Sequence, residues 1–106
     1  MKDRVELLKA AIKHTAGDRD VEYGSPYFNL SDCAALWTTY IIGKFRGTSV
    51  DENTFALTAE DVAHLNVLQK MARTFPGKVK LDTYEDIAAY GAIAGECAQA
   101  EEEDKE

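Results

Sequence analysis

Two acidic segments of this chain share one residue pattern, and their carboxylates are the side chains best suited to catalysis or metal binding. Residues 58–63 read Thr-Ala-Glu-Asp-Val-Ala, and residues 83–88 read Thr-Tyr-Glu-Asp-Ile-Ala. A threonine followed three positions later by an acidic residue forms a capping box, so each segment is predicted to begin a helix. Asp61 and Asp86 are the third-position acids, and carboxylates of this kind either cap a helix or bind a cation.

The spacing of apolar residues places both aspartates on the face that each helix is predicted to bury. Leu65, Leu68 and Ala72 follow Asp61 at helical spacing, and the equivalent positions after Asp86 are also apolar. A buried carboxylate needs a hydrogen-bond donor, a cation or a metal, and Mg2+ prefers oxygen ligands. Two interpretations therefore remain open. Asp61 and Asp86 are either a pair of metal ligands or a pair of helix caps stabilised by the helix dipole.

The two aspartates can share one metal only if the chain brings both helix starts to the same end. A tight antiparallel hairpin would separate these starts by roughly 20 Å, at 1.5 Å per residue. A shared site would then need a second subunit or a crossing link. The same hairpin would place Lys70 and Arg73 beside the start of the second helix, which holds Asp82 and Asp86. These charges would either bind a phosphate and a metal or form weak salt bridges at a turn.

A charged loop is the second candidate site. Residues 18–26 read Asp-Arg-Asp-Val-Glu-Tyr-Gly-Ser-Pro, which is longer and more charged than a helix connection requires. A calcium-binding loop is excluded, because its sixth position is Tyr23 instead of glycine and its twelfth is Asn29 instead of glutamate. Two interpretations remain: a plain connector, or a ligand loop with Arg19 on a phosphate and Tyr23 stacked on a base.

The remaining residues that could react show no established motif. His14 and His64 are isolated in the sequence, which favours packing or surface roles. Cys33 and Cys97 have no CxxC partner and are predicted to be reduced core thiols. The sequence contains no GxSxG, HExxH, P-loop or GxGxxG motif. Ordinary nucleophilic, zinc-protease and Rossmann chemistry therefore have no support.

Helical periodicity and turn signals predict an all-α, four-helix bundle-like single domain. The predicted helices cover about 3–15, 29–45, 58–73 and 83–100. Their apolar stripes, which the bundle is predicted to bury, include Val5, Leu8 and Ile12, then Leu36, Trp37 and Tyr40, then Leu65 and Leu68. The domain is predicted to occupy residues 1–100, followed by a disordered acidic tail at 101–106. A chain of 106 residues has a modest core, so a homodimer that extends this core is expected.

The net charge and the hydropathy of the chain limit the kinds of partner that it can bind. A net charge of −7 argues against general nucleic-acid binding, but it permits a basic protein partner or a ligand in a local cationic pocket. No apolar run approaches 18 residues, so no membrane span is expected. The N-terminus lacks an apolar secretory segment, and a cytoplasmic location is expected.

A set of residues spread over 18–96 resembles a known family. The matching positions are Arg19, Tyr23-Gly24-x-Pro26, Asn29, Ala35-Leu36-Trp37, Leu57-Thr58-x-x-Asp61-Val62, Lys70-x-x-Arg73 and Asp82-x-x-x-Asp86-Ile87-Ala88-x-Tyr90. This pattern resembles small domains of unknown function encoded by bacteriophages and prophages. More distantly, it is similar to the all-α MazG-type pyrophosphohydrolases, which hold Mg2+ with helical carboxylates and cleave nucleoside triphosphates between the α and β phosphates. The chain departs from the MazG signature, because neither ExxE nor the later ExxD is intact.

The resemblance implies a Mg2+-dependent nucleotide site with three classes of residue. The implied residues are Asp61, Asp82 and Asp86 as metal ligands, Glu60 and Glu85 as catalytic groups, and Arg19, Tyr23, Lys70, Arg73 and Tyr90 as substrate-binding groups. The alternative is a non-catalytic acidic phage module that inhibits a host factor or sequesters a nucleotide signal. A structural or assembly protein of the virion is a third class. For the first two, the host-cell cytoplasm is the expected location.

Overall fold

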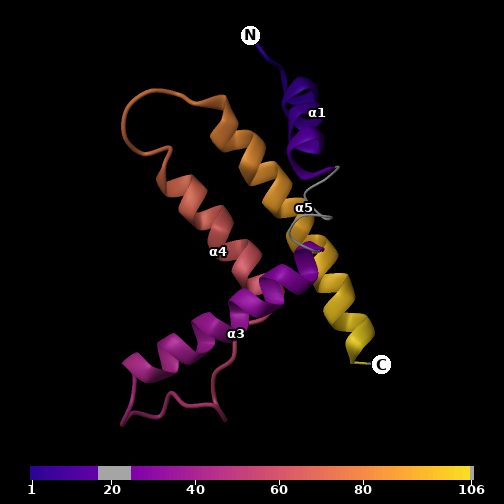
Figure 1. Cartoon of the computed structure of the whole chain (residues 1–106). Coiled ribbons are helices and arrows are strands. Elements are labelled where there is room, and N and C mark those ends of the chain that lie inside the picture. Colours follow the sequence, from indigo (N-terminus) through magenta and orange to yellow (C-terminus); the bar gives the residue numbers. More distant parts are fainter. Residues whose placement is uncertain (17–24, 106) are drawn as a thin grey trace.

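The computed structural model of the chain describes residues 1–16 and 25–105. Within these residues it contains four helices, α1 (Arg4–Thr15), α3 (Pro26–Lys44), α4 (Ala59–Ala72) and α5 (Leu81–Asp104). None of the described residues forms a β-strand, so the predicted all-α class is confirmed for this part of the chain (Figure 1). None of the described helices combines the length and the apolar character needed to cross a membrane.

The centre of the fold is an antiparallel hairpin of α4 and α5. The start of α4 contacts the end of α5 through Glu60 and Glu101, and the end of α4 contacts the start of α5 through Lys70 and Asp86. Helix α1 packs mainly on α5, while α3 crosses the hairpin near the start of α4 (Figure 1). The far half of α3 extends beyond this crossing without another helix beside it.

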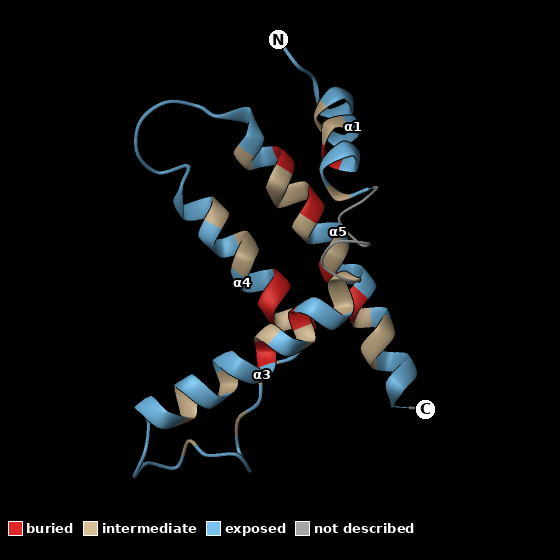
Figure 2. Ribbon diagram, in the orientation of Figure 1, coloured by how far each residue is buried: buried red, intermediate tan, exposed pale blue. Residues whose placement is uncertain are grey.

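The core lies where α3 crosses the hairpin, and Figure 2 shows buried segments of all three helices near this point. Its buried members are Leu30 and Ala34 of α3, Ala59, Val62 and Ala63 of α4, and Ala94 and Cys97 of α5. Four of these seven residues are alanines, which let the helix backbones approach closely. The same small side chains bury little apolar surface, so the core stabilises the single chain only modestly.

The two cysteines belong to this core region. Cys97 is fully buried and Cys33 is half-buried, and both are free thiols. Burial raises the pKa of both thiols, and the negative charge of Glu101 adds to this effect at Cys97. A thiol with a raised pKa stays protonated and is a weak nucleophile. The predicted position of both cysteines in the core region is confirmed.

The starts of α4 and α5 differ although their sequences match. At α4, the Thr58 hydroxyl accepts from the Asp61 amide at 3.1 Å, and the Asp61 carboxylate accepts from the Thr58 amide at 2.9 Å. This is the predicted capping box. Helix α5 instead begins at Leu81, with no side-chain cap, so the predicted cap at Thr83 is wrong. Thr83 lies inside the helix, where a residue cannot adopt the extended conformation that an N-cap needs.

Helix α3 also begins earlier than predicted. Ser25, and not Asn29, is its N-cap, and the Ser25 hydroxyl accepts from the Phe28 amide at 3.4 Å. Pro26 occupies the first helical position, where its fixed φ suits the helix and its missing N–H would have had no partner within the helix. The order Ser-Pro is therefore a helix start here, with the serine as the cap and the proline at the first helical position.

The end of α5 also differs from the prediction of a disordered tail from Glu101. Helix α5 continues to Asp104. The Glu101 carboxylate accepts from the Glu60 amide at 2.9 Å, and the Tyr27 hydroxyl donates to the Asp104 carboxylate. These two contacts with α4 and α3 hold the last turns of α5 in place. The acidic composition alone did not reveal them.

Candidate functional site

The predicted residues Glu60 and Asp61 lie at the acidic end of the hairpin, where α4 begins and α5 ends. The Asp61 carboxylate is used in the capping box, and the Glu60 amide is bonded to Glu101. The Glu60 side chain is 37% exposed and lies 3.7 Å from His64, one helical turn away. The groups at this end thus satisfy one another, which matches the capping interpretation of Asp61.

Asp86 lies at the opposite end, where its carboxylate is 3.0 Å from the Lys70 ammonium. Lys70 follows Asp61 by nine residues on α4, so the two aspartates are roughly 14 Å apart along the helix axis. One chain therefore does not bring Asp61 together with Asp82 and Asp86. Across residues 1–16 and 25–105, no three His, Cys, Asp or Glu side chains gather in a group that could hold a metal ion.

Glu85, the second predicted catalytic group, is buried under α1. Its side chain is only 3% exposed, with one carboxylate oxygen 2.8 Å from His14 Nε2 and the other 3.4 Å from the Lys2 ammonium. A buried carboxylate requires such donors, because without them its desolvation is costly. In this chain Glu85 holds α1 against α5. The sequence offered no signal for His14 as its partner, since the two residues are 71 positions apart.

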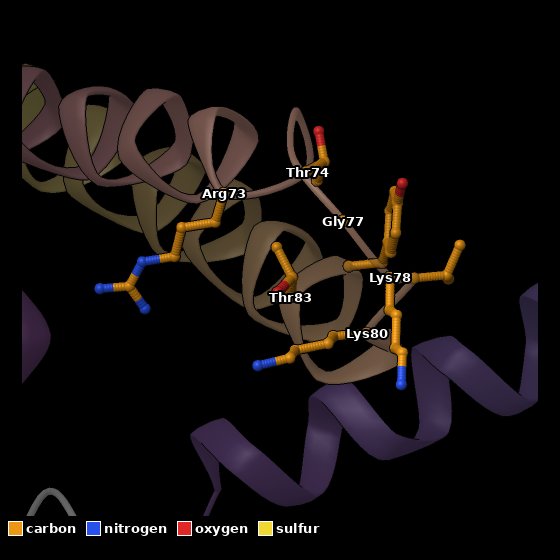
Figure 3. Close-up of a pocket in the computed structure, with 8 residues that line it drawn as sticks. Arg73, Thr74, Gly77, Lys78, Lys80 and Thr83 are labelled. Carbon is orange, nitrogen blue, oxygen red and sulfur yellow. The ribbon is translucent and has the colours of Figure 1, made fainter.

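The turn between α4 and α5 forms a small cationic hollow. Its lining residues are Arg73, Thr74, Gly77, Lys78, Val79, Lys80, Thr83 and Tyr84. Figure 3 shows the side chains of Arg73, Lys78 and Lys80 around this hollow, with Thr83 among them and with the three charged tips apart from one another. The cavity volume of about 40 Å3 suits one small polar group, because a whole ligand pocket typically measures roughly 300–1,000 Å3.

The start of α5 contributes a further positive feature to this hollow. Lys80 is the N-cap residue, and no side chain bonds the first amides of the helix. Helix N-termini favour anions, because the amides there lack helical partners and the helix dipole is positive at this end. Gly77 has a φ of +75°, which lets the chain turn sharply between the two helices.

The other predicted site residues have separate locations. Asp82 is exposed in the first turn of α5, and Tyr90 is half-buried one turn after Asp86. Arg73 lines the hollow. Arg19 and Tyr23 lie outside the described residues. Lys78 and Lys80 also line the hollow, although they are not among the predicted site residues.

A model for a domain of unknown function, DUF6378, matches residues 6–98 of the chain. The chain belongs to the DUF6378 family. No curated protein and no solved structure shows significant similarity to it. This match confirms a domain of unknown function and gives no link to phage proteins or to MazG-type enzymes. The DUF6378 domain includes the entire α4–α5 turn and both of the acidic segments that match in sequence.

Proposed function

We propose that this DUF6378 domain binds the phosphates of a nucleotide at the α4–α5 turn. The supporting observation is that four of the twelve Lys and Arg residues, Lys70, Arg73, Lys78 and Lys80, fall within eleven residues of a chain whose net charge is −7. Three of these four line the hollow. A local cationic cluster of this kind attracts anions even when the whole protein is acidic.

The chemistry of the cluster fits a polyphosphate better than a single carboxylate. Arginine and lysine form charge-assisted hydrogen bonds to phosphate oxygens, and a polyphosphate offers several such oxygens to Arg73, Lys78 and Lys80. The uncapped start of α5 adds backbone donors at the same place. The small cavity suits one phosphate group, so the base and sugar would lie outside it.

The α5 carboxylates fit Mg2+ bound together with such a nucleotide. Asp82 and Asp86 are four residues apart and therefore lie on one face of the helix. Mg2+ commonly takes one or two protein carboxylates and completes its shell with phosphates and waters. Bound there, the ion would neutralise phosphate charge. Lys70, already paired with Asp86, would hold that carboxylate in position.

A Mg2+-dependent pyrophosphohydrolase of MazG-like type, encoded by a phage, is the enzymatic form of this proposal. It rests on the sequence resemblance. In one chain, however, Glu60 lies at the far end of the hairpin and Glu85 is covered by α1. Turnover would therefore need a homo-oligomer in which another copy supplies acidic groups. We propose that the working protein is such a homo-oligomer in the cytoplasm of the host cell.

Binding without turnover is the second candidate. It is favoured by the internal partners of Asp61 and Glu85, since both carboxylates already have structural roles. In this form the protein sequesters a nucleotide signal, or its nucleotide-bound form inhibits a host factor.

Calorimetric titration with nucleoside triphosphates tests the binding site. We expect Arg73→Gln combined with Lys80→Gln to weaken binding by about 100-fold or more, because each lost charged contact is worth about 1.5–3 kcal/mol. Lys9→Gln and Lys13→Gln together are the matched control, since they remove two exposed charges from α1. Equal affinities of the site variant and the control would contradict the proposal.

Pyrophosphate release, measured with Mg2+ on the same samples, separates the two candidates. Release that Asp86→Asn abolishes, with helicity retained, would support the enzyme. Binding without release would support sequestration.

A further inference from the structure

The single chain exposes far more surface than a compact protein of its mass. A folded monomer of 11.7 kDa exposes roughly 5,900 Å2, whereas this chain exposes 8008 Å2. The radius of gyration is 16.0 Å, and a compact chain of 106 residues has roughly 13 Å. The excess of roughly 2,100 Å2 per chain is comparable to what one subunit contributes to an obligate homodimer, in which 2,000–5,000 Å2 is buried in total.

Much of the exposed surface is apolar and lies on α3 and α4. On α3 and its C-cap, Leu36 is 71%, Tyr40 68% and Phe45 49% exposed. On α4, Leu65, Leu68 and Met71 are also exposed. Leu36 and Tyr40, like Leu65 and Leu68, belong to stripes that helical periodicity predicts to be buried. The single chain leaves these stripes open, because α3 contacts α4 only near their crossing (Figure 1).

Charge favours a second copy of the chain as the partner on this face. Helix α3 contains only two charged residues in its 19 positions, Asp32 and Lys44. Two copies with net charge −7 can therefore meet across α3 without concentrated like charge. A strongly basic or acidic partner would find only one opposite charge on this helix, at Asp32 or at Lys44. An isologous contact also needs the same patch on both subunits, and the α3–α4 face supplies it.

The stability of the fold also favours a second copy of the chain as the partner. The buried core of one chain consists largely of alanine, so the open stripes must be covered before the fold becomes stable. A partner needed for folding must be present whenever the chain is made, and a second copy always is.

We infer that two copies of this chain form an obligate homodimer through the far half of α3 with its C-cap (residues 36–45) and the Leu65–Leu68–Met71 stripe of α4. This inference deepens the homo-oligomer of the proposed function by naming its interface and by coupling folding to assembly. It does not depend on nucleotide binding, since assembly is measured without any ligand.

Sedimentation equilibrium and urea unfolding of the full chain test this inference. We expect a mass twice the 11.7 kDa of one chain and an unfolding midpoint that rises with protein concentration. A monomer that unfolds cooperatively with a midpoint independent of concentration would overturn the inference. It would also leave the face for a different protein partner.

Three variants locate the interface. Leu36→Arg and Leu68→Arg each place a charge on the proposed face, and Ala35→Arg places the same charge at an exposed α3 position outside the stripe. We expect the first two to lower the unfolding midpoint and to shift the protein to monomer, folded or unfolded, while Ala35→Arg remains a dimer. Dimers of unchanged affinity in both Leu36→Arg and Leu68→Arg would overturn the assignment of the interface.

Discussion

The starts of α4 and α5 share one sequence pattern, but they lie at opposite ends of the hairpin. One end is acidic and the other is cationic. At the acidic end, Asp61 caps α4 and Glu101 bonds the Glu60 amide, so the polar groups satisfy one another. At the cationic end, the equivalent Asp86 is not a cap and pairs with Lys70 across the two helices. An identical local motif therefore does not imply an identical role, because the surrounding chain decides which partners reach each carboxylate.

The two ends also differ in whether their polar groups have partners within the chain. At the acidic end, Asp61 and Glu101 accept hydrogen bonds from backbone amides and thereby stabilise the helix termini. The cationic end remains open, with an uncapped helix start and a hollow lined by Arg73, Lys78 and Lys80. Helix capping takes place at the acidic end, and we propose ligand binding at the cationic end.

The largest effect on stability is expected at Glu85, compared with its sequence equivalent Glu60. Glu85→Ala removes a buried acceptor shared by His14 and Lys2, and we expect a loss of about 2–3 kcal/mol in the free energy of unfolding. Glu60→Ala removes an exposed ion pair with His64 and should change the free energy of unfolding by at most about 0.5 kcal/mol. Urea unfolding at one fixed protein concentration measures both. Equal losses would mean that Glu85 does not anchor α1.

A smaller difference is expected between the two aspartates. Asp61→Ala removes half of the capping box and should cost about 1 kcal/mol, whereas Asp61→Asn should cost less because the asparagine side-chain oxygen can still accept from the Thr58 amide. Asp86→Ala breaks only a partly exposed ion pair and should cost less than Asp61→Ala, at most about 1 kcal/mol. Thermal unfolding compares the variants. A larger loss at Asp86 would reverse the assignment of the structural end.

The smallest effect is expected at the end of α5, from the hydrogen bond of Tyr27 to Asp104. This bond raises the pKa of Tyr27 above its ordinary value of 10.0, because the neutral hydroxyl donates to a carboxylate. A raised folded-state pKa means that the contact stabilises the fold fully below the unfolded pKa and is lost as the pH rises through the folded pKa. We therefore expect the last turns of α5 to loosen only in strongly alkaline solution.

Difference absorbance titration of wild type against Tyr27→Phe isolates this one phenol. Asp104→Asn should shift its titration to lower pH. An unchanged titration would show that the contact does not form in solution.

The contacts that sequence predicted are local ones. The Thr58–Asp61 box joins residues three apart, and the antiparallel hairpin follows from a short link between two helices. The Glu85–His14 contact joins residues 71 apart, and neither residue type reveals its partner. The cap at Thr83 was predicted wrongly for a related reason. Its motif is intact, but nothing between Gly77 and Leu81 prevents the helix from starting earlier.

The candidate site was only partly predictable. A hairpin, one of the arrangements left open by the sequence, would place Lys70, Arg73 and Asp86 at one end, and they lie there. Lys78 and Lys80 lie in the turn itself and line the hollow with Arg73, and no motif in the sequence marks them as site residues. Grouping Asp61 with Asp86 followed from their shared motif, but the hairpin places them at opposite ends.

Amide NMR during titration with a nucleoside triphosphate tests the contrast between the two ends most directly. Residues from both ends are observed in one spectrum, so each end is the control for the other. We predict that the largest shifts fall on residues 70–84 and that residues 58–61 change little. Shifts concentrated at residues 58–61 and 97–104, or the absence of shifts at both ends, would contradict phosphate binding at the cationic end.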